Sequence, residues 1–171
     1  MSELNVRVVT LPPMRVAAFH AFSPSPEEDA LAAMAAWAKQ QGLSGPPAQR
    51  LFGFDTTDTA PGSTKRGYEV WLTVGPEIVG DEGATIKQFG GGLYAVTHCI
   101  VRDPWQDIPG TWKKLAQWAE GSAYRMGNHQ WLEEHLHEPL EPGVVFTLDL
   151  YMPIVQSRTS QIADVLKTFV L

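Results

Sequence analysis

One order of predicted secondary structure occurs twice in this chain of 171 residues, and it constrains the fold more than any other feature. The first copy comprises a strand at 14–22, a helix at 23–42, and strands at 51–57 and 68–74. The second copy comprises a strand at 93–101, a helix at 107–121, and strands at 130–138 and 146–154. A repeat of this kind indicates that one supersecondary unit is duplicated within a single domain.

Residues of matching type support the duplication at separations near 80. The pairs are His20 with His98 at 78 residues, Trp37 with Trp118 at 81, and Trp71 with Tyr151 at 80. We therefore treat residues 1–171 as one domain. Its parts are repeat one (about 5–75), a linker (76–90), repeat two (about 91–155) and a C-terminal extension (156–171).

The first helix carries both a start and a stop signal. Ser25 is followed by Pro26 and, three positions after Ser25, by Glu28, which is the pattern of a capping box with proline in the first turn. Gly42 follows the last residue of the periodic pattern and is a typical helix end.

The last strand of each copy has one apolar face and one mixed face. The apolar faces comprise Tyr68, Val70, Leu72 and Val74 in the first copy and Leu148, Leu150, Met152 and Ile154 in the second. The mixed faces comprise Glu69, Trp71 and Thr73 in the first copy and Asp149, Tyr151 and Pro153 in the second. The apolar face must pack against the helices, so we predict an α+β fold with an antiparallel sheet and both helices on one face. A pseudo-twofold axis then relates the repeats and places a ligand groove on the helix-free face.

Charge and cysteine content exclude several classes of function. A net charge of -6 argues against nucleic acid or an anionic membrane as a direct partner. The single cysteine, Cys99, excludes an internal disulfide and fits a reducing compartment. No stretch approaches the roughly 18 apolar residues of a membrane helix, and the N-terminus has no apolar signal core. We therefore expect a cytoplasmic protein.

The order and spacing of four motifs resemble the GyrI-like effector-binding family. They are "GYEVWLTV" (67–74), "GGLYAV" (91–96), "WLEEHL" (131–136) and "LDLYMPI" (148–154), and the resemblance covers roughly residues 5–155. Members of the family include gyrase-inhibitory proteins and the drug-sensing domains of some bacterial transcription activators. In that family a glutamate in a Phe/Tyr-Glu-x-Tyr/Ile segment lies in the ligand pocket. The resemblance matches this glutamate to Glu133 and implies that Glu133 binds the ligand.

The repeat is a second route to the same glutamate. Laying residues 51–54 over residues 132–135 places Glu133 and His135 on the mixed face, and it turns Glu134 toward the helices. The predicted ligand-binding residues are Phe52, Phe54, Glu69, Trp71, Trp131, Glu133, His135 and Tyr151.

A carboxylate among aromatic rings favours one class of ligand. Burial removes water from the carboxylate, so its pKa rises and its charged form is destabilised. A bound organic cation restores the balance and lies over ring faces, each contact contributing about 0.5–2 kcal/mol. We therefore predict a stand-alone protein that binds amphipathic cationic or aromatic small molecules, without a metal or a cofactor.

Two other functions remain open. The resemblance extends to hydrolases that open strained cyclopropane rings, in which Glu133 would be the catalytic acid or base and His135 would share the proton transfer. A gyrase-inhibitor-like protein would instead act on a protein partner, which requires a large exposed apolar patch and a filled groove.

Overall fold

The computed structural model of the chain describes residues 3–58 and 60–169. In chain order, its elements are β1 (Val6–Leu11), β2 (Met14–Ser23), α1 (Pro26–Gln40), β3 (Leu51–Asp55), β4 (Arg66–Thr73), β5 (Thr85–Phe89), β6 (Gly92–Val101), α2 (Pro104–Glu120), β7 (Tyr124–Met126), β8 (Leu132–His135), β9 (Phe146–Gln156) and α3 (Arg158–Phe169).

The strands form an antiparallel sheet whose order is symmetric about its centre. The order is β1-β6-β9-β8-β3-β4-β2-β5, and β7 pairs with the end of β9. β3 and β8 are equivalent strands of the two repeats, and they pair with each other at the centre. Outward from this pair, β9 corresponds to β4, β6 to β2 and β1 to β5. The predicted α+β fold with an antiparallel sheet and pseudo-twofold repeats is confirmed.

The duplicated unit is longer than predicted, because each copy begins with an additional strand. β1 precedes β2 in the chain but pairs with β6, and β5 precedes β6 but pairs with β2. Segment 76–90, predicted to be a linker, therefore contains β5 and belongs to the sheet. Each copy supplies an edge strand to the other half, which ties the halves together.

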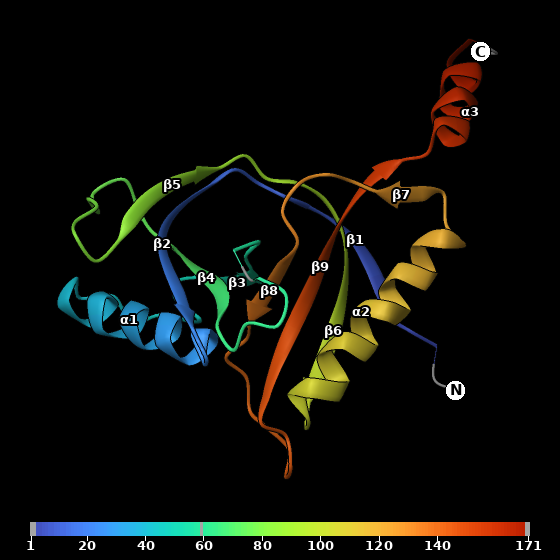
Figure 1. The fold of residues 1–171 in the computed structure, drawn as a ribbon. Coiled ribbons are helices and arrows are strands. Elements are labelled where there is room, and N and C mark those ends of the chain that lie inside the picture. The colour runs from blue at the N-terminus through green and yellow to red at the C-terminus, as the bar shows by residue number, and fades with distance from the viewer. Residues whose placement is uncertain (1–2, 59, 170–171) are drawn as a thin grey trace.

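The two long helices cover opposite ends of the same sheet face (Figure 1). α1 packs on β2 and β4, where the rings of Phe19 and Trp37 meet edge to face at 5.4 Å. α2 packs on β6, β7 and β9 around the fully buried Leu115. The central strands β3 and β8 lie between the strands that the helices cover, so a helix flanks the centre of the sheet on either side.

The helix starts differ in detail from the predictions. Ser25 is the residue before α1, but its side chain makes no capping hydrogen bond, and instead its N–H donates to Ser23 Oγ at 3.2 Å. α2 begins at Pro104, earlier than predicted, because the Asp103 carboxylate caps it by accepting a hydrogen bond from the Trp105 N–H at 3.0 Å.

The sheet curves toward its helix-free face, and side chains of this face pack against one another in the concave space. β1 lies at one edge of the sheet and β2 next to the other, yet only Pro12 and Pro13 connect them, so the two edges approach each other. The return connection from β5 to β6 contains Gly91, whose φ is 75° and whose position against the Leu11 carbonyl leaves no room for a side chain. The buried apolar side chains on this face are Leu11, Met14, Val16, Ala18, Phe52, Trp71, Tyr94, Val96, Leu132 and Tyr151. The expectation of an open groove is therefore wrong at the centre of this face, because a packed core occupies it.

The C-terminal extension forms α3, which projects away from the sheet (Figure 1). Residues 170 and 171 of the predicted extension lie outside the described residues. Across the described ranges, no helix combines the length and apolarity needed to cross a membrane.

Candidate functional site

β8 places Glu133 at the centre of the sheet. Glu133 lies directly opposite Gly53 of β3, and these two residues are 80 positions apart in the chain. The same separation relates β4 to β9. The pseudo-twofold axis therefore passes between Gly53 and Glu133.

The repeat alignment used to predict the faces is one residue out of register at this point. It matches Leu51 to Leu132, which are 81 positions apart, whereas the strand pairing relates β3 to β8 at 80. Because side chains alternate between faces, a shift of one residue moves each of them to the opposite face. Glu134 thus lies on the helix-free face and Glu133 on the helix side, the reverse of the prediction.

The predicted ligand-binding residues are accordingly divided between the two faces. Those on the helix-free face are Phe52, Phe54, Glu69, Trp71 and Tyr151. Those on the helix side are Trp131, Glu133 and His135. The prediction that all of them line one groove is wrong, since the structure forms two separate groups.

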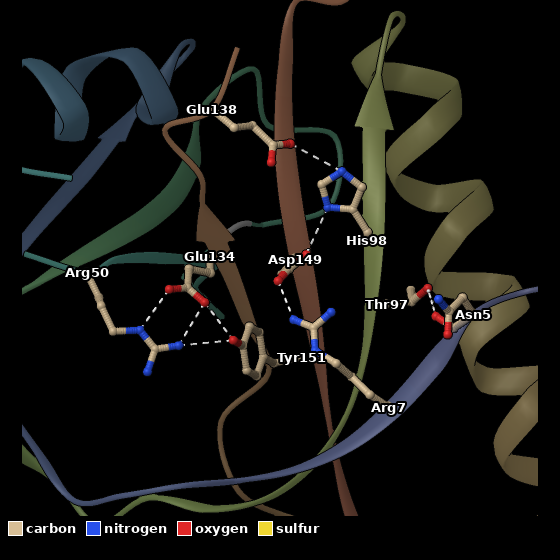
Figure 2. Close-up of polar contacts among 9 residues, drawn as sticks. All are labelled: Asn5, Arg7, Arg50, Thr97, His98, Glu134, Glu138, Asp149 and Tyr151. Carbon is tan, nitrogen blue, oxygen red and sulfur yellow. Dashed lines mark hydrogen bonds and ion pairs between the residues drawn. The ribbon is translucent and has the colours of Figure 1, made fainter. Parts of the chain in front are cut away.

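The buried carboxylates of the helix-free face have cationic partners. Glu134 accepts two hydrogen bonds from the Arg50 guanidinium, both at 2.8 Å, and one from the Tyr151 hydroxyl at 2.6 Å (Figure 2). The other partnerships are those of Asp149 with Arg7 and His98, and of Glu69 with Lys87 and the Trp71 indole. These contacts compensate the carboxylate charges within the protein, so we assign them a structural role.

Replacing Arg50 by glutamine is expected to destabilise the fold by about 1–2 kcal/mol, because Glu134 then stays buried without its cation. The Arg50 side chain is 40% exposed, and solvent screening keeps the loss below the roughly 3–5 kcal/mol of a fully buried pair. Urea unfolding at pH 7 measures the change. The double variant Arg50→Gln/Glu134→Gln should recover part of the loss, and an unrecovered loss would show that the unpaired carboxylate is not its cause.

A second polar cluster lies on the helix side, between α1 and α2. The Tyr68 hydroxyl is 3.1 Å from Glu133 Oε2 and 3.2 Å from His135 Nε2. Tyr68 reaches across β3 because Gly53 has no side chain; a Cβ there would overlap the hydroxyl and lie 2.6 Å from the ring Cζ. Trp112 of α2 also lowers the pKa of Glu133, less strongly than Tyr68 does. We call Tyr68, Trp112, Glu133 and His135 the inter-helix site.

The Glu133 carboxyl titrates near neutral pH. Burial raises its pKa from 4.5 to about 7, and the hydrogen bond from Tyr68 together with the nearby Trp112 counters only part of this effect. Negative charge at Asp55 and Glu27 raises the pKa further. At pH 7 the carboxyl is therefore divided between its protonated and charged forms.

The two polar neighbours of Glu133 stay neutral. Burial lowers the pKa of His135 to about 4, and burial raises the pKa of Tyr68 well above its usual value of 10.0. The network is satisfied when His135 carries its proton on Nε2 and donates to the Tyr68 oxygen, while Tyr68 donates to Glu133. Glu133 is thus the member of the cluster that carries charge.

Aromatic rings and further carboxylates surround this cluster. Trp112 meets Trp131 edge to face, with ring centroids 5.1 Å apart. Asp55 is the cross-strand partner of Tyr68, and Glu27 lies in the first turn of α1. The site therefore combines negative charge with aromatic surface, a combination that attracts organic cations.

Sequence reasoning identifies Trp131, Glu133 and His135 but misses Tyr68, Trp112 and Gly53. The apolar alternation of its strand predicts Tyr68 on the helix-packed face, which is correct, but it predicts no role for the hydroxyl. The available signal was Gly53, since a glycine inside a strand of large apolar residues indicates close approach of another group.

Two repeats that share one sheet, each covered by a helix, form the architecture of effector-binding domains. The chain belongs to the Cass2 family of integron-associated effector-binding proteins, whose model matches residues 7–154. This result confirms the resemblance to GyrI-like proteins. No curated protein sequence matches the chain.

Solved structures with the same fold have very different sequences. The C-terminal domain of EcmrR is 10% identical, with a TM-score of 0.65 over 90% of this chain and 99% of that chain. A hydrolase from Listeria innocua is 13% identical, with a TM-score of 0.61 over 91% of this chain and 94% of that chain. SAV2435 bound to tetraphenylphosphonium is 11% identical, with a TM-score of 0.52 over 89% of this chain and 95% of that chain. At these identities the similarity shows the fold alone.

Proposed function

We propose that the protein binds amphipathic organic cations at the inter-helix site, with Glu133 as their charge partner. The observation that supports this most directly is the contrast between buried Glu134 on the helix-free face and half-buried Glu133 on the helix side. Glu134 is neutralised by Arg50, whereas Glu133, within the described residues, is in no ion pair. A cation that reaches Glu133 stabilises its charged form and gains a partner that the protein itself does not supply.

The neighbouring rings favour ligands that are flat or aromatic as well as positively charged. Trp112 and Trp131 are both half-buried and lie beside the carboxylate, so they offer apolar surface for a ligand. A structure of the same fold, SAV2435, is bound to the lipophilic cation tetraphenylphosphonium, which supports this ligand class and provides a probe.

Substituting Glu133 by glutamine is expected to weaken binding of tetraphenylphosphonium by about 10- to 100-fold at pH 8, because a charged contact is lost. Isothermal titration calorimetry measures the affinity. Wild-type affinity should rise with pH through about 7, where the Glu133 carboxyl ionises, and this rise should be absent in the variant.

Glu134→Gln is the matched control, since it makes the same change at the adjacent position on the opposite face. A folded Glu134→Gln protein should bind tetraphenylphosphonium like the wild type. Equal affinities of the wild type and Glu133→Gln would disprove the proposed role of Glu133.

A hydrolase is the second candidate, and the hydrogen bond between Tyr68 and Glu133 favours it. A carboxyl with a pKa of about 7 can both donate and accept a proton at neutral pH, and Tyr68 is placed to orient it. Incubation with a cyclopropane-bearing electrophile, followed by mass spectrometry, tests ring opening. Turnover that is lost in Glu133→Gln and reduced in Tyr68→Phe would support catalysis, whereas turnover that both variants retain would exclude it at this site.

A further inference from the structure

Trp105 is an exposed tryptophan at one end of the helix side of the sheet. It lies in the first turn of α2, and 79% of it is accessible to solvent. Its ring is faced by the Arg66 guanidinium, whose carbon is 5.8 Å from the ring centroid. This is the geometry of a cation–π contact. The protein thus already places a cation over an accessible aromatic ring.

Two carboxylates of its own repeat also bind Arg66. Its two terminal nitrogens donate to the Glu27 carboxylate at 2.8 and 2.9 Å, and Asp55 lies 3.8 Å away. Glu27 belongs to the first turn of α1, whereas Trp105 belongs to the first turn of α2. Arg66 therefore links the beginnings of both helices across the space that separates them.

This link adjoins the inter-helix site. Arg66 and Tyr68 are two residues apart on β4, so their side chains leave the same face of the sheet about 7 Å apart. Asp55 is the cross-strand partner of Tyr68, and both Asp55 and Glu27 raise the pKa of Glu133. The carboxylates that hold Arg66 thus contribute to the same negative field that would attract a ligand.

We propose that Arg66 competes with the ligand cation for the ring of Trp105. In the ligand-free protein, the Arg66 guanidinium contacts this ring and the Glu27 carboxylate. When a ligand binds, its cationic group replaces the guanidinium on the Trp105 ring. The inference rests on the proposed function of the inter-helix site and adds Trp105 as a ligand contact. A ligand must then be large enough to reach both Glu133 and Trp105. Small cations cannot make both contacts, so the competition selects extended aromatic cations.

A double-mutant cycle at Arg66 and Trp105 tests the competition, with tetraphenylphosphonium as the probe and calorimetry as the readout. Arg66→Gln should tighten binding by about 2- to 30-fold, and Trp105→Leu should weaken it by a similar factor, the range expected for one cation–π contact. In the Trp105→Leu background, Arg66→Gln should no longer tighten binding. Thermal unfolding of each variant identifies any that fails to fold. Arg66→Lys is a second substitution, which keeps the positive charge but loses the planar contact with the ring, and it should increase affinity less than Arg66→Gln does.

The outcomes separate this inference from the proposed function. Weaker or unchanged binding by folded Arg66→Gln would overturn the competition while leaving Glu133 as the charge partner. An affinity gain from Arg66→Gln that persists in the Trp105→Leu background would also overturn it. The gain would then come from removing a positive charge near the site and not from freeing the Trp105 ring. Binding that appears only when Arg66 is replaced would support the competition. Lack of binding by both the wild type and Arg66→Gln would overturn the proposed cation binding and the competition together.

Discussion

The Glu133→Gln variant is expected to be more stable than the wild type at pH 8, by about 3 kcal/mol. Folding raises the pKa of Glu133 from 4.5 to about 7, so between these values the folded protein holds a proton that the unfolded chain releases. The wild type therefore loses stability as the pH rises from about 4.5 through 7, whereas glutamine does not ionise. Urea unfolding of both proteins between pH 4 and pH 8 measures the difference.

His135 has the opposite pH dependence and provides the control. Folding lowers its pKa from 6.5 to about 4, so its contribution to stability is lost as the pH falls through this range. Between about pH 4.5 and 6.5 the two effects oppose each other. Glu133→Gln should therefore gain stability with rising pH in this window, and His135→Gln should lose it. A Glu133→Gln protein that is stabilised equally at pH 4 and pH 8 would contradict the assigned ionisation.

Replacing Gly53 by alanine is expected to destabilise the fold by about 1–3 kcal/mol, because the new methyl group overlaps the Tyr68 hydroxyl and ring. Moving Tyr68 away also removes a hydrogen bond that lowers the pKa of Glu133. The pH at which tetraphenylphosphonium binding strengthens should consequently move above 7. Urea unfolding measures the first effect, and calorimetric titration over pH measures the second.

The repeat suggests a control for Gly53→Ala, namely the substitution Tyr68→Leu. Leu148 occupies the equivalent position in repeat two, 80 residues later, so leucine suits this place in the fold. Gly53→Ala should cost much less in the Tyr68→Leu background than in the wild type. A cost that is the same in both backgrounds would show that alanine destabilises β3 in some other way.

The fold could be predicted because two strong signals agreed. The helix pattern and the apolar alternation of the last strands recur in the same order in both repeats. Each pattern can be recognised from neighbouring residues alone. β1 and β5 were missed because both are edge strands that pair with the opposite repeat. The segment of β5, "TIKQF", is short and lies in a glycine-rich stretch, so nothing in its local sequence indicates its partner.

The faces around Glu133 could not be predicted reliably, because the repeat offers more than one register. Matching residues are 78, 81 and 80 positions apart in the first strands, the helices and the last strands. An alignment at 81 positions places the Glu134 carboxylate on the helix side, where burial without a partner is unfavourable. The structure instead places it on the helix-free face, where Arg50, 84 positions away in the chain, neutralises it. Such a distant partner leaves no local signal in the sequence.

The pairing of Gly53 with Glu133 across the pseudo-twofold axis has a consequence for how such a protein can arise. A dimer of identical repeats must carry the same residue on both sides of its axis. Either two glutamates or two glycines would then face each other across the axis. Joining the repeats in one chain allows the two positions to diverge, and one then supplies the charge while the other supplies the space for Tyr68. We accordingly expect one cation per chain, although the architecture is twofold.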